Sequence, residues 1–271
     1  MISETFALTV RELKHWYRVK MQIFVTLIQP IVWLGLFGQA FNLNKFVPAS
    51  QFQMIFGTSD YFSYMSIGML AVIVLFTCMF GGMSIVWDRR FGFLQKLRAA
   101  PIPRSSIALS RIFATTIRAM IQMTIVLVIA LLFVYVPGLT GLTVSPSFNA
   151  LDLVGLYFAL FLLAIMFSSM FTSIALYVEN QETLFGIINL LNLPLMFASA
   201  ALFPTGMMPT WLQDVASYNP LTLAVDGARQ FVFHTASPIY PAWLDLLGLA
   251  IIAAAFVALA LLVAKKTMSA K

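Results

Sequence analysis

The chain has 271 residues, of which 61% are hydrophobic and only 10% are charged. A soluble domain would carry about 25% charged residues, so this composition excludes an ordinary water-soluble protein and indicates one that lies in lipid. The 16 basic and 10 acidic residues give a net charge of +6. The single cysteine, Cys78, excludes an intrachain disulfide.

Six stretches of the sequence are apolar over about the 20 residues that a helix needs to cross a bilayer. They are predicted at residues 21–41, 62–86, 107–136, 151–178, 183–203 and 242–264. The third stretch contains Arg111 and Arg118 in its first half, so we place its lipid-facing part at about 119–136. The sequence therefore predicts an all-α integral membrane protein with six transmembrane helices, and residues 1–271 are expected to form a single transmembrane domain without a separate soluble core.

The positions of the basic residues predict how the chain is oriented. Fourteen of the 16 lie before the first stretch, between the second and third, or after the sixth, whereas the acidic residues divide equally between the two sides. By the positive-inside rule, both termini face the cytoplasm of a prokaryotic cell, and the protein lies in the cytoplasmic membrane. A cleaved signal peptide is the competing interpretation of the first stretch, but that stretch is longer than the 7–15 residues of a typical signal core.

Several kinds of chemistry have no motif in the sequence. The chain has no G-x-x-x-x-G-K-[ST] loop, so it is not expected to be an enzyme that hydrolyses ATP. No acidic residue is predicted at the middle depth of a span, which disfavours a proton-coupled or sodium-coupled carrier. No serine–histidine arrangement and no metal motif can be drawn at one depth, so we expect no catalytic residue, metal or resident cofactor. The basic residues flank the spans, and no nucleic-acid partner is expected. A secondary carrier or a channel remains the alternative function.

Residues 1–20 predict an amphipathic helix that lies in the cytoplasmic interface of the bilayer. Apolar side chains recur on one face and basic side chains occupy the opposite face, as helical spacing requires. The residues concerned are Phe6, Val10, Leu13 and Tyr17 on the apolar face and Arg11, Lys14 and Arg18 on the basic face. The alternative is an ordinary basic flank that only fixes the orientation of the chain.

The cytoplasmic stretch between the second and third spans combines apolar and basic residues. A short helix over about 90–98, ended by Pro101, would present apolar side chains within a basic rim. That composition is typical of a docking surface for a protein partner. The candidate contact residues are Arg89, Arg90, Phe91, Gly92, Phe93, Leu94, Gln95, Lys96 and Leu97. The alternative is a turn whose aromatic residues return to lipid.

Prolines and a glycine break the chain after the fifth span, near the outer interface. Two short apolar segments follow at 211–218 and 221–234, and neither is long enough to span. Because broken backbone at that depth must be covered by protein, a pair of re-entrant half-helices is predicted, with a simple surface hairpin as the alternative. Asp226 and Arg229 lie three residues apart and are predicted to form an ion pair. The residues of this outer motif are Pro204, Gly206, Pro209, Trp211, Asn219, Pro220, Asp226 and Arg229.

The order of these features resembles the permease subunit of ABC type-2 exporters of the drug-resistance, nodulation-factor and polysaccharide group. One motif, D-R-R-F-G-F-L-Q-K-L-R-A-A-P-I-P-R at 88–104, is similar to the family's loop between spans two and three. The other motif, F-P-T-G-M-M-P-T-W-L followed by Y-N-P-L-T and D-G-A-R over 203–229, is similar to the signature before the last span. The resemblance covers essentially the whole chain. Gln95 departs from the pattern, because many members carry an acidic residue there, and this leaves open the usual charged contact with the partner.

The resemblance implies a permease that works as a dimer, either of two identical chains or of two related ones. It implies two copies of a cytoplasmic ABC ATPase subunit, which bind ATP and magnesium and push on the helix at 90–98. It also implies export of an amphipathic or lipid-linked substrate, such as a drug, a glycolipid or a polysaccharide. Polar residues within the spans are candidates for lining the path, although each could equally join helices. These residues are Gln29, Gln122, Asn189 and Asn192.

Overall fold

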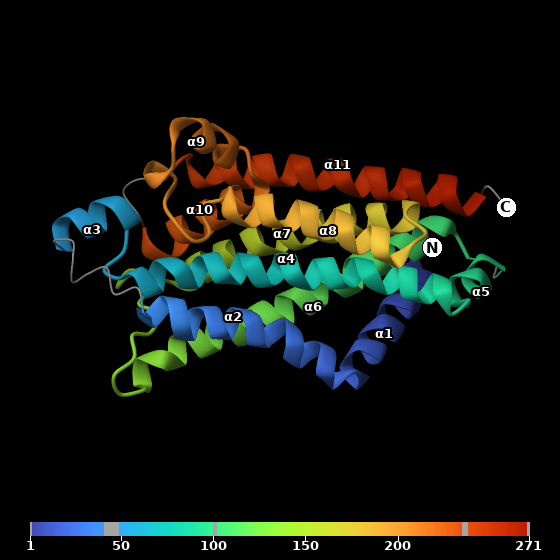
Figure 1. The fold of residues 1–271 in the computed structure, drawn as a ribbon, viewed down its shortest axis with the longest axis horizontal. Coiled ribbons are helices and arrows are strands. Elements are labelled where there is room, and N and C mark those ends of the chain that lie inside the picture. Colours follow the sequence, from blue (N-terminus) through green and yellow to red (C-terminus); the bar gives the residue numbers. More distant parts are fainter. Residues whose placement is uncertain (1, 41–48, 100–101, 235–237, 270–271) are drawn as a thin grey trace.

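The computed structural model describes residues 2–40, 49–99, 102–234 and 238–269. All regular structure in these described ranges is helical, so the predicted all-α fold is confirmed. Figure 1 shows the long helices running side by side in one bundle. Such an arrangement satisfies every backbone hydrogen bond within each segment, as lipid requires.

The helices follow one another with short connections. In chain order they are α1 (Ile2–Arg18), α2 (Lys20–Ala40), α3 (Ala49–Phe56), α4 (Tyr61–Arg90), α5 (Phe93–Ala99), α6 (Arg104–Leu132), α7 (Ala150–Tyr177), α8 (Gln181–Phe197), α9 (Thr210–Ser217), α10 (Pro220–Phe233) and α11 (Ala242–Ser269), with 3₁₀ turns η2 (Phe133–Tyr135) and η3 (Thr205–Met207). Figure 1 places α5 and the last turns of α11 at one end of the bundle, called the α5 end below. It places α3 and α9 at the opposite end, called the α3 end.

Within the described residues, five segments are long and apolar enough to cross a membrane: Ile23–Ala40, Phe52–Arg90, Arg104–Tyr135, Ala150–Tyr177 and Ala242–Thr267. They overlap five of the six predicted spans. The predicted fifth span at 183–203 is shorter than expected, because α8 has 17 residues and ends at Phe197. At 1.5 Å per residue it is about 26 Å long, slightly less than the roughly 30 Å of hydrocarbon. Pro194 lies in its last turn, where a proline cannot continue the ladder of backbone bonds.

Helix α4 forms the centre of the bundle, and 89% of its most apolar segment is buried. It begins at Asp60, whose side chain accepts a hydrogen bond from the backbone N–H of Ser63 at 2.7 Å. Glycines on α4 let its neighbours approach closely. A Cβ on Gly82 would lie 2.9 Å from the side chain of Phe171 on α7. The core is therefore built around α4, with α6 and α7 in direct contact with it.

Candidate functional site

The predicted docking helix is present at the α5 end, but it begins later than expected. Helix α4 continues through Arg90, Phe91 and Gly92 form a turn, and α5 runs from Phe93 to Ala99. Gly92 has a φ of +72°, a left-handed conformation that favours glycine. The predicted start at Arg90 is therefore wrong, because the apolar and basic residues before the turn extend α4 instead.

The apolar side chains of this segment divide into two groups. Phe91 is 80% exposed, and Arg90, Gln95 and Lys96 around it are also exposed. Leu97 is buried and Phe93 is half-buried, so α5 is attached to the bundle by these two residues. The predicted contact at Leu94 concerns a side chain outside the described ones.

Arg89, one of the predicted contact residues, also forms contacts within this chain. Its guanidinium donates to the backbone carbonyl oxygens of Val178 at 2.7 Å and Leu176 at 2.8 Å. These carbonyls belong to the end of α7, where helical carbonyls lack partners within the helix. Arg89 therefore joins α4 to α7 inside the protein, beside the turn that presents Phe91.

Helix α1 has the predicted apolar and basic faces, and a third face that packs against the bundle. Phe6 and Tyr17 are about 70% exposed, and Val10 and Leu13 are half-buried, as expected for a stripe that contacts lipid. The basic residues Arg11, Lys14 and Arg18 are exposed. The face that contacts the bundle carries Thr9, Glu12 and Trp16, which are all buried.

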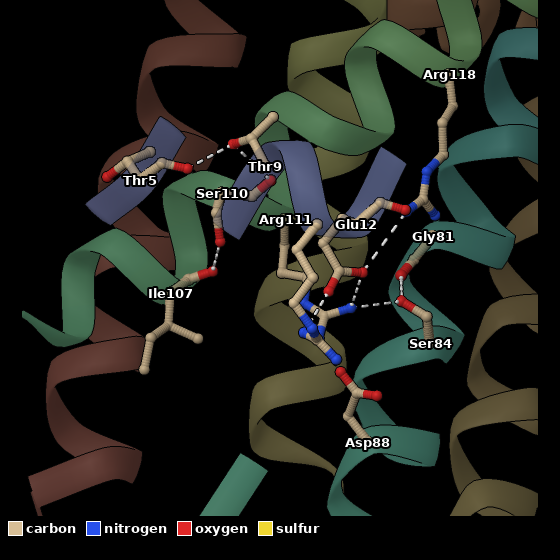
Figure 2. Close-up of polar contacts among 11 residues, drawn as sticks. Thr5, Thr9, Glu12, Gly81, Ser84, Asp88, Ile107, Ser110, Arg111 and Arg118 are labelled. Carbon is tan, nitrogen blue, oxygen red and sulfur yellow. Dashed lines mark hydrogen bonds and ion pairs between the residues drawn. The ribbon is translucent and has the colours of Figure 1, made fainter. Parts of the chain in front are cut away.

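Glu12 is the centre of a buried charge cluster, shown in Figure 2. Its Oε2 lies 2.6 Å from Nη1 of Arg111 and 3.6 Å from Nη2 of Arg118, both on α6. Arg118 also donates to the backbone carbonyl of Glu12 at 2.6 Å, and Arg111 also pairs with Asp88 on α4. Only about 5% of Glu12, Arg111 and Arg118 is exposed. Since a buried charge requires a partner, this cluster fixes α1 to α6 and α4.

Arg11 connects the charge cluster to α5. Its Nη1 lies 2.9 Å from Oε1 of Glu12, and its guanidinium carbon lies 3.5 Å from the ring centroid of Phe93. A cation over an aromatic face at this distance is attracted by the ring. A continuous line of contacts thus runs from α5 through α1 to α6 and α4.

Sequence reasoning missed this cluster, although two of its features were visible. Arg111 and Arg118 lie seven residues apart, which places them two turns apart on one face of a helix. Thr9, Glu12 and Trp16 share a face of α1 at spacings of three and four. Charged residues within an apolar helix indicate a partner in the interior, but neither spacing identifies which residue that partner is.

At the α3 end, α9 and α10 closely match the two predicted short segments. Helix α10 packs against α7, α11 and α4, and most of its residues are buried. Helix α9 is mostly exposed within this chain, since Ala216 is its one buried residue. Asn219 begins α10: its side chain accepts from Leu221 N–H and donates to the carbonyls of Leu195 and Ala198 at 3.0 and 2.6 Å.

The predicted ion pair between Asp226 and Arg229 is wrong. Arg229 is buried and donates to the carbonyls of Tyr64, Ala200 and Ala201 at 2.9, 2.7 and 3.1 Å. Asp226 accepts from the backbone N–H of Ile239 at 2.8 Å instead. Both side chains satisfy backbone groups of the broken segments, which is why they do not turn toward each other.

The remaining residues of the outer motif lie around these two. Pro220 occupies the first turn of α10, where a missing N–H costs nothing. Pro204 is buried, whereas Gly206, Pro209 and Trp211 are exposed.

The four candidate path residues lie in different environments. Gln122 is buried and joins three helices, because it donates to Thr26 at 2.6 Å and accepts from Thr77. Gln29 is exposed. Asn189 is exposed and donates to the carbonyl of Phe185, while Asn192 is buried and its Oδ1 has no partner among the described residues. Gln122 thus holds helices together within the chain, as the alternative interpretation had it.

A serine–histidine arrangement, which the sequence analysis did not expect, is present at the α3 end. His234 Nδ1 lies 2.7 Å from Ser147 Oγ, and His234 Nε2 lies 3.3 Å from Asp152 Oδ2. Asp152 also accepts from Asn149 N–H at the start of α7, and His234 ends α10 in a left-handed conformation. These contacts fasten the end of α10 to the start of α7.

The fold and its polar contacts define the class of protein: a multi-pass helical membrane protein with charged residues clustered at one end and broken helices at the other. The ABC-2 type transporter family model matches residues 3–233. The chain therefore belongs to the ABC-2 type transporter family and is an ABC transporter permease.

Individual relatives match over most of their length. The ycf38 protein of Porphyra purpurea, described as a transport permease, is 33% identical over 87% of this chain and 76% of its own. DrrC of Mycobacterium tuberculosis, described as a doxorubicin resistance ABC transporter permease, is 23% identical over 85% of this chain and 77% of its own. DrrB1 of Streptomyces coeruleorubidus, described as a daunorubicin resistance ABC transporter permease, is 20% identical over 87% of this chain and 77% of its own.

Proposed function

We propose that this permease moves an amphipathic or lipid-linked substrate out across the cytoplasmic membrane, using ATP hydrolysis by a separate subunit. Two relatives are described as permeases of drug resistance, which supports an exporter of apolar drug-like or lipid-like molecules. The chain has no phosphate-binding loop of its own. The assembly would contain two permease chains and two copies of the ATPase, which holds ATP and magnesium.

The observation that carries this proposal is the exposure of Phe91 at the α5 end. A phenylalanine that is 80% exposed, between the basic residues Arg90 and Lys96, is suited to enter a pocket on a water-soluble partner. The α5 end would then face the cytoplasm, together with α1. The ATPase would contact the turn at Phe91–Gly92 and the outer face of α5.

The contacts of Arg11 indicate how movement of the ATPase would reach the spans. A push on α5 would move Phe93, and with it the guanidinium of Arg11 on α1. Because Glu12 is held by Arg111 and Arg118, a displacement of α1 would be passed to α6. A closely packed, ion-paired junction moves as a unit, so a small shift at α5 would tilt the long helices.

The test is co-purification of the permease with its ATPase, together with ATP turnover of the complex. We expect Phe91→Ala to weaken assembly by about tenfold or more, which corresponds to a contact of about 1.4 kcal/mol or more in a pocket. Membrane insertion should be unchanged, because no span is altered. Lys96→Ala is the matched control on the same surface and should have much less effect. A Phe91→Ala variant that assembles and transports like the parent would exclude this turn as the docking site.

The proposed orientation has a separate test. In a Cys78→Ala background, a cysteine placed at Lys96 should react with a membrane-impermeant reagent only after the cells are opened. A cysteine at Asp214, on α9, should react in intact cells. The reverse pattern would overturn the orientation.

A further inference from the structure

A cavity of about 480 Å³ lies at the α3 end, between α3, η3, α10 and the segment that precedes α11. This volume falls within the roughly 300–1,000 Å³ of sites that bind small molecules. Its walls are mainly apolar, and they include Met54, Ile55, Pro204, Met207 and Ile239. Binding an apolar molecule of drug size against these walls would remove apolar surface from water, which is favourable.

Among the described residues, Asp226 and Arg229 are the charged ones that line the cavity. The two terminal nitrogens of Arg229 are bound to three backbone carbonyls. Asp226 uses Oδ2 to accept from the backbone N–H groups of Ile239 and Tyr240. No hydrogen bond to its Oδ1 is formed by the described residues, and Asp226 lines the cavity, so we take this oxygen as the acceptor for a ligand.

The surroundings of Asp226 favour a cation near that oxygen. Burial raises the pKa of Asp226 above its ordinary value, because the charged carboxylate has lost water. The hydrogen bonds from the backbone N–H groups of Ile239 and Tyr240, and then the positive charge of Arg229, offset part of this rise in pKa. Arg229 forms no ion pair with Asp226 within the described part of the chain. A second positive group in the cavity would supply the missing partner.

We propose that this cavity binds an apolar molecule of drug size that carries a protonated amine, with the amine on Asp226 and the apolar body against the walls. Neither the family assignment nor the relatives' descriptions assign a site here. That the bound molecule is also the transported substrate rests on the proposed function. The binding site itself is tested on the permease alone, and that test does not depend on the proposed function.

The experiment measures binding of a matched pair of fluorescent probes to the purified permease in detergent, with empty micelles subtracted. Monodansylcadaverine has an apolar ring system and a primary ammonium group, and its N-acetyl derivative keeps the ring system without the charge. We expect the charged probe to bind the parent at least about tenfold more tightly, as one hydrogen bond to a charged group provides. Asp226→Asn should remove that difference.

Two further variants separate the site from general effects on the protein. Asp214→Asn changes an exposed aspartate on α9 and should leave both affinities unchanged. Gly206 lines the cavity and has open space beside it, so Gly206→Trp should fill the cavity and weaken both probes. The proposal is overturned if Gly206→Trp leaves the affinities of both probes unchanged. It is also overturned if Asp226→Asn binds each probe with the same affinity as the parent does. ATP-driven transport is measured separately, so a complex that transports without binding these probes would contradict the cavity site alone.

Discussion

The two ends of the bundle satisfy their buried polar groups in different ways. At the α5 end, charged side chains from separate helices pair with one another, as Glu12 does with Arg111 and Arg118. At the α3 end, buried polar side chains bond mainly to backbone groups, as Arg229 does with three carbonyls and Asn219 with two.

The continuity of the helices explains this difference. At the α5 end the charge cluster lies between the sides of α1, α4 and α6, whose backbone bonds are made within each helix, so Arg111 pairs with carboxylates. Arg118 and Arg89 also donate to backbone carbonyls there, at Glu12 and at the end of α7. At the α3 end, α8 stops within the bundle, and the carbonyls in and just after its last turn need donors. The ion pairs join three long helices into one junction that moves as a unit, whereas the backbone contacts at the α3 end fix one local shape. The α5 end is thus suited to transmitting movement and the α3 end to holding a site.

The largest loss of stability is expected from Glu12→Gln. This change removes the negative partner of two buried arginines, and an uncompensated buried charge costs about 3–5 kcal/mol. The measurement is denaturant unfolding of the permease in detergent. Lys14→Gln, an exposed change on the same helix, should alter the free energy of unfolding by less than about 0.5 kcal/mol. A loss below about 1 kcal/mol for Glu12→Gln would mean that the cluster does not hold α1.

A smaller loss, of about 2–3 kcal/mol, is expected from Arg229→Met. Three buried carbonyls lose a charged donor, and each unpaired group has a desolvation cost. Arg229→Lys should restore part of the stability, because an ammonium can reach fewer of the three oxygens. The measurement is again the free energy of unfolding in detergent. If Arg229→Met and Arg229→Lys had the same free energy of unfolding, the carbonyl contacts would not stabilise the broken segment.

The smallest effect is expected from His234→Ala. The side chain of His234 is 37% exposed, so its contacts with Ser147 and Asp152 are expected to contribute at most about 1 kcal/mol. Unfolding of this variant should therefore resemble that of the parent. A loss as large as that of Arg229→Met would show that the junction between α10 and α7 matters more than its exposure suggests.

Most of the long helices, and the break before α9 and α10, could be predicted from the sequence, whereas α3 was not predicted. Long apolar stretches indicated the bundle, and the prolines around Gly206 and Pro220 located α9 and α10 almost to the residue. The length of α8 could not be predicted, because the residues after Phe197 remain apolar while the chain already turns. In this region the packing of Asn219 and Arg229 against the chain determines where the helix stops.

The site was predicted in part. The docking segment and the amphipathic helix were located, but their connection was not. Glu12 and Arg111 are 99 residues apart in the sequence, so their pairing depends on how α1 folds back along α6. The same holds for Arg229. Its nearest charged neighbour in the sequence, Asp226, suggested an ion pair, but in the fold Arg229 donates to backbone carbonyls instead.

The link between α5 and the charge cluster is tested most directly by the number of substrate molecules moved per ATP. Arg11→Ala removes the contact with Phe93 and leaves Glu12 paired with Arg111 and Arg118. In proteoliposomes with the complete complex, we expect this variant to assemble and hydrolyse ATP while transport per ATP falls several-fold. Lys14→Ala should keep the parent ratio. An unchanged ratio in Arg11→Ala would contradict the claim that α1 carries movement from α5 to the spans.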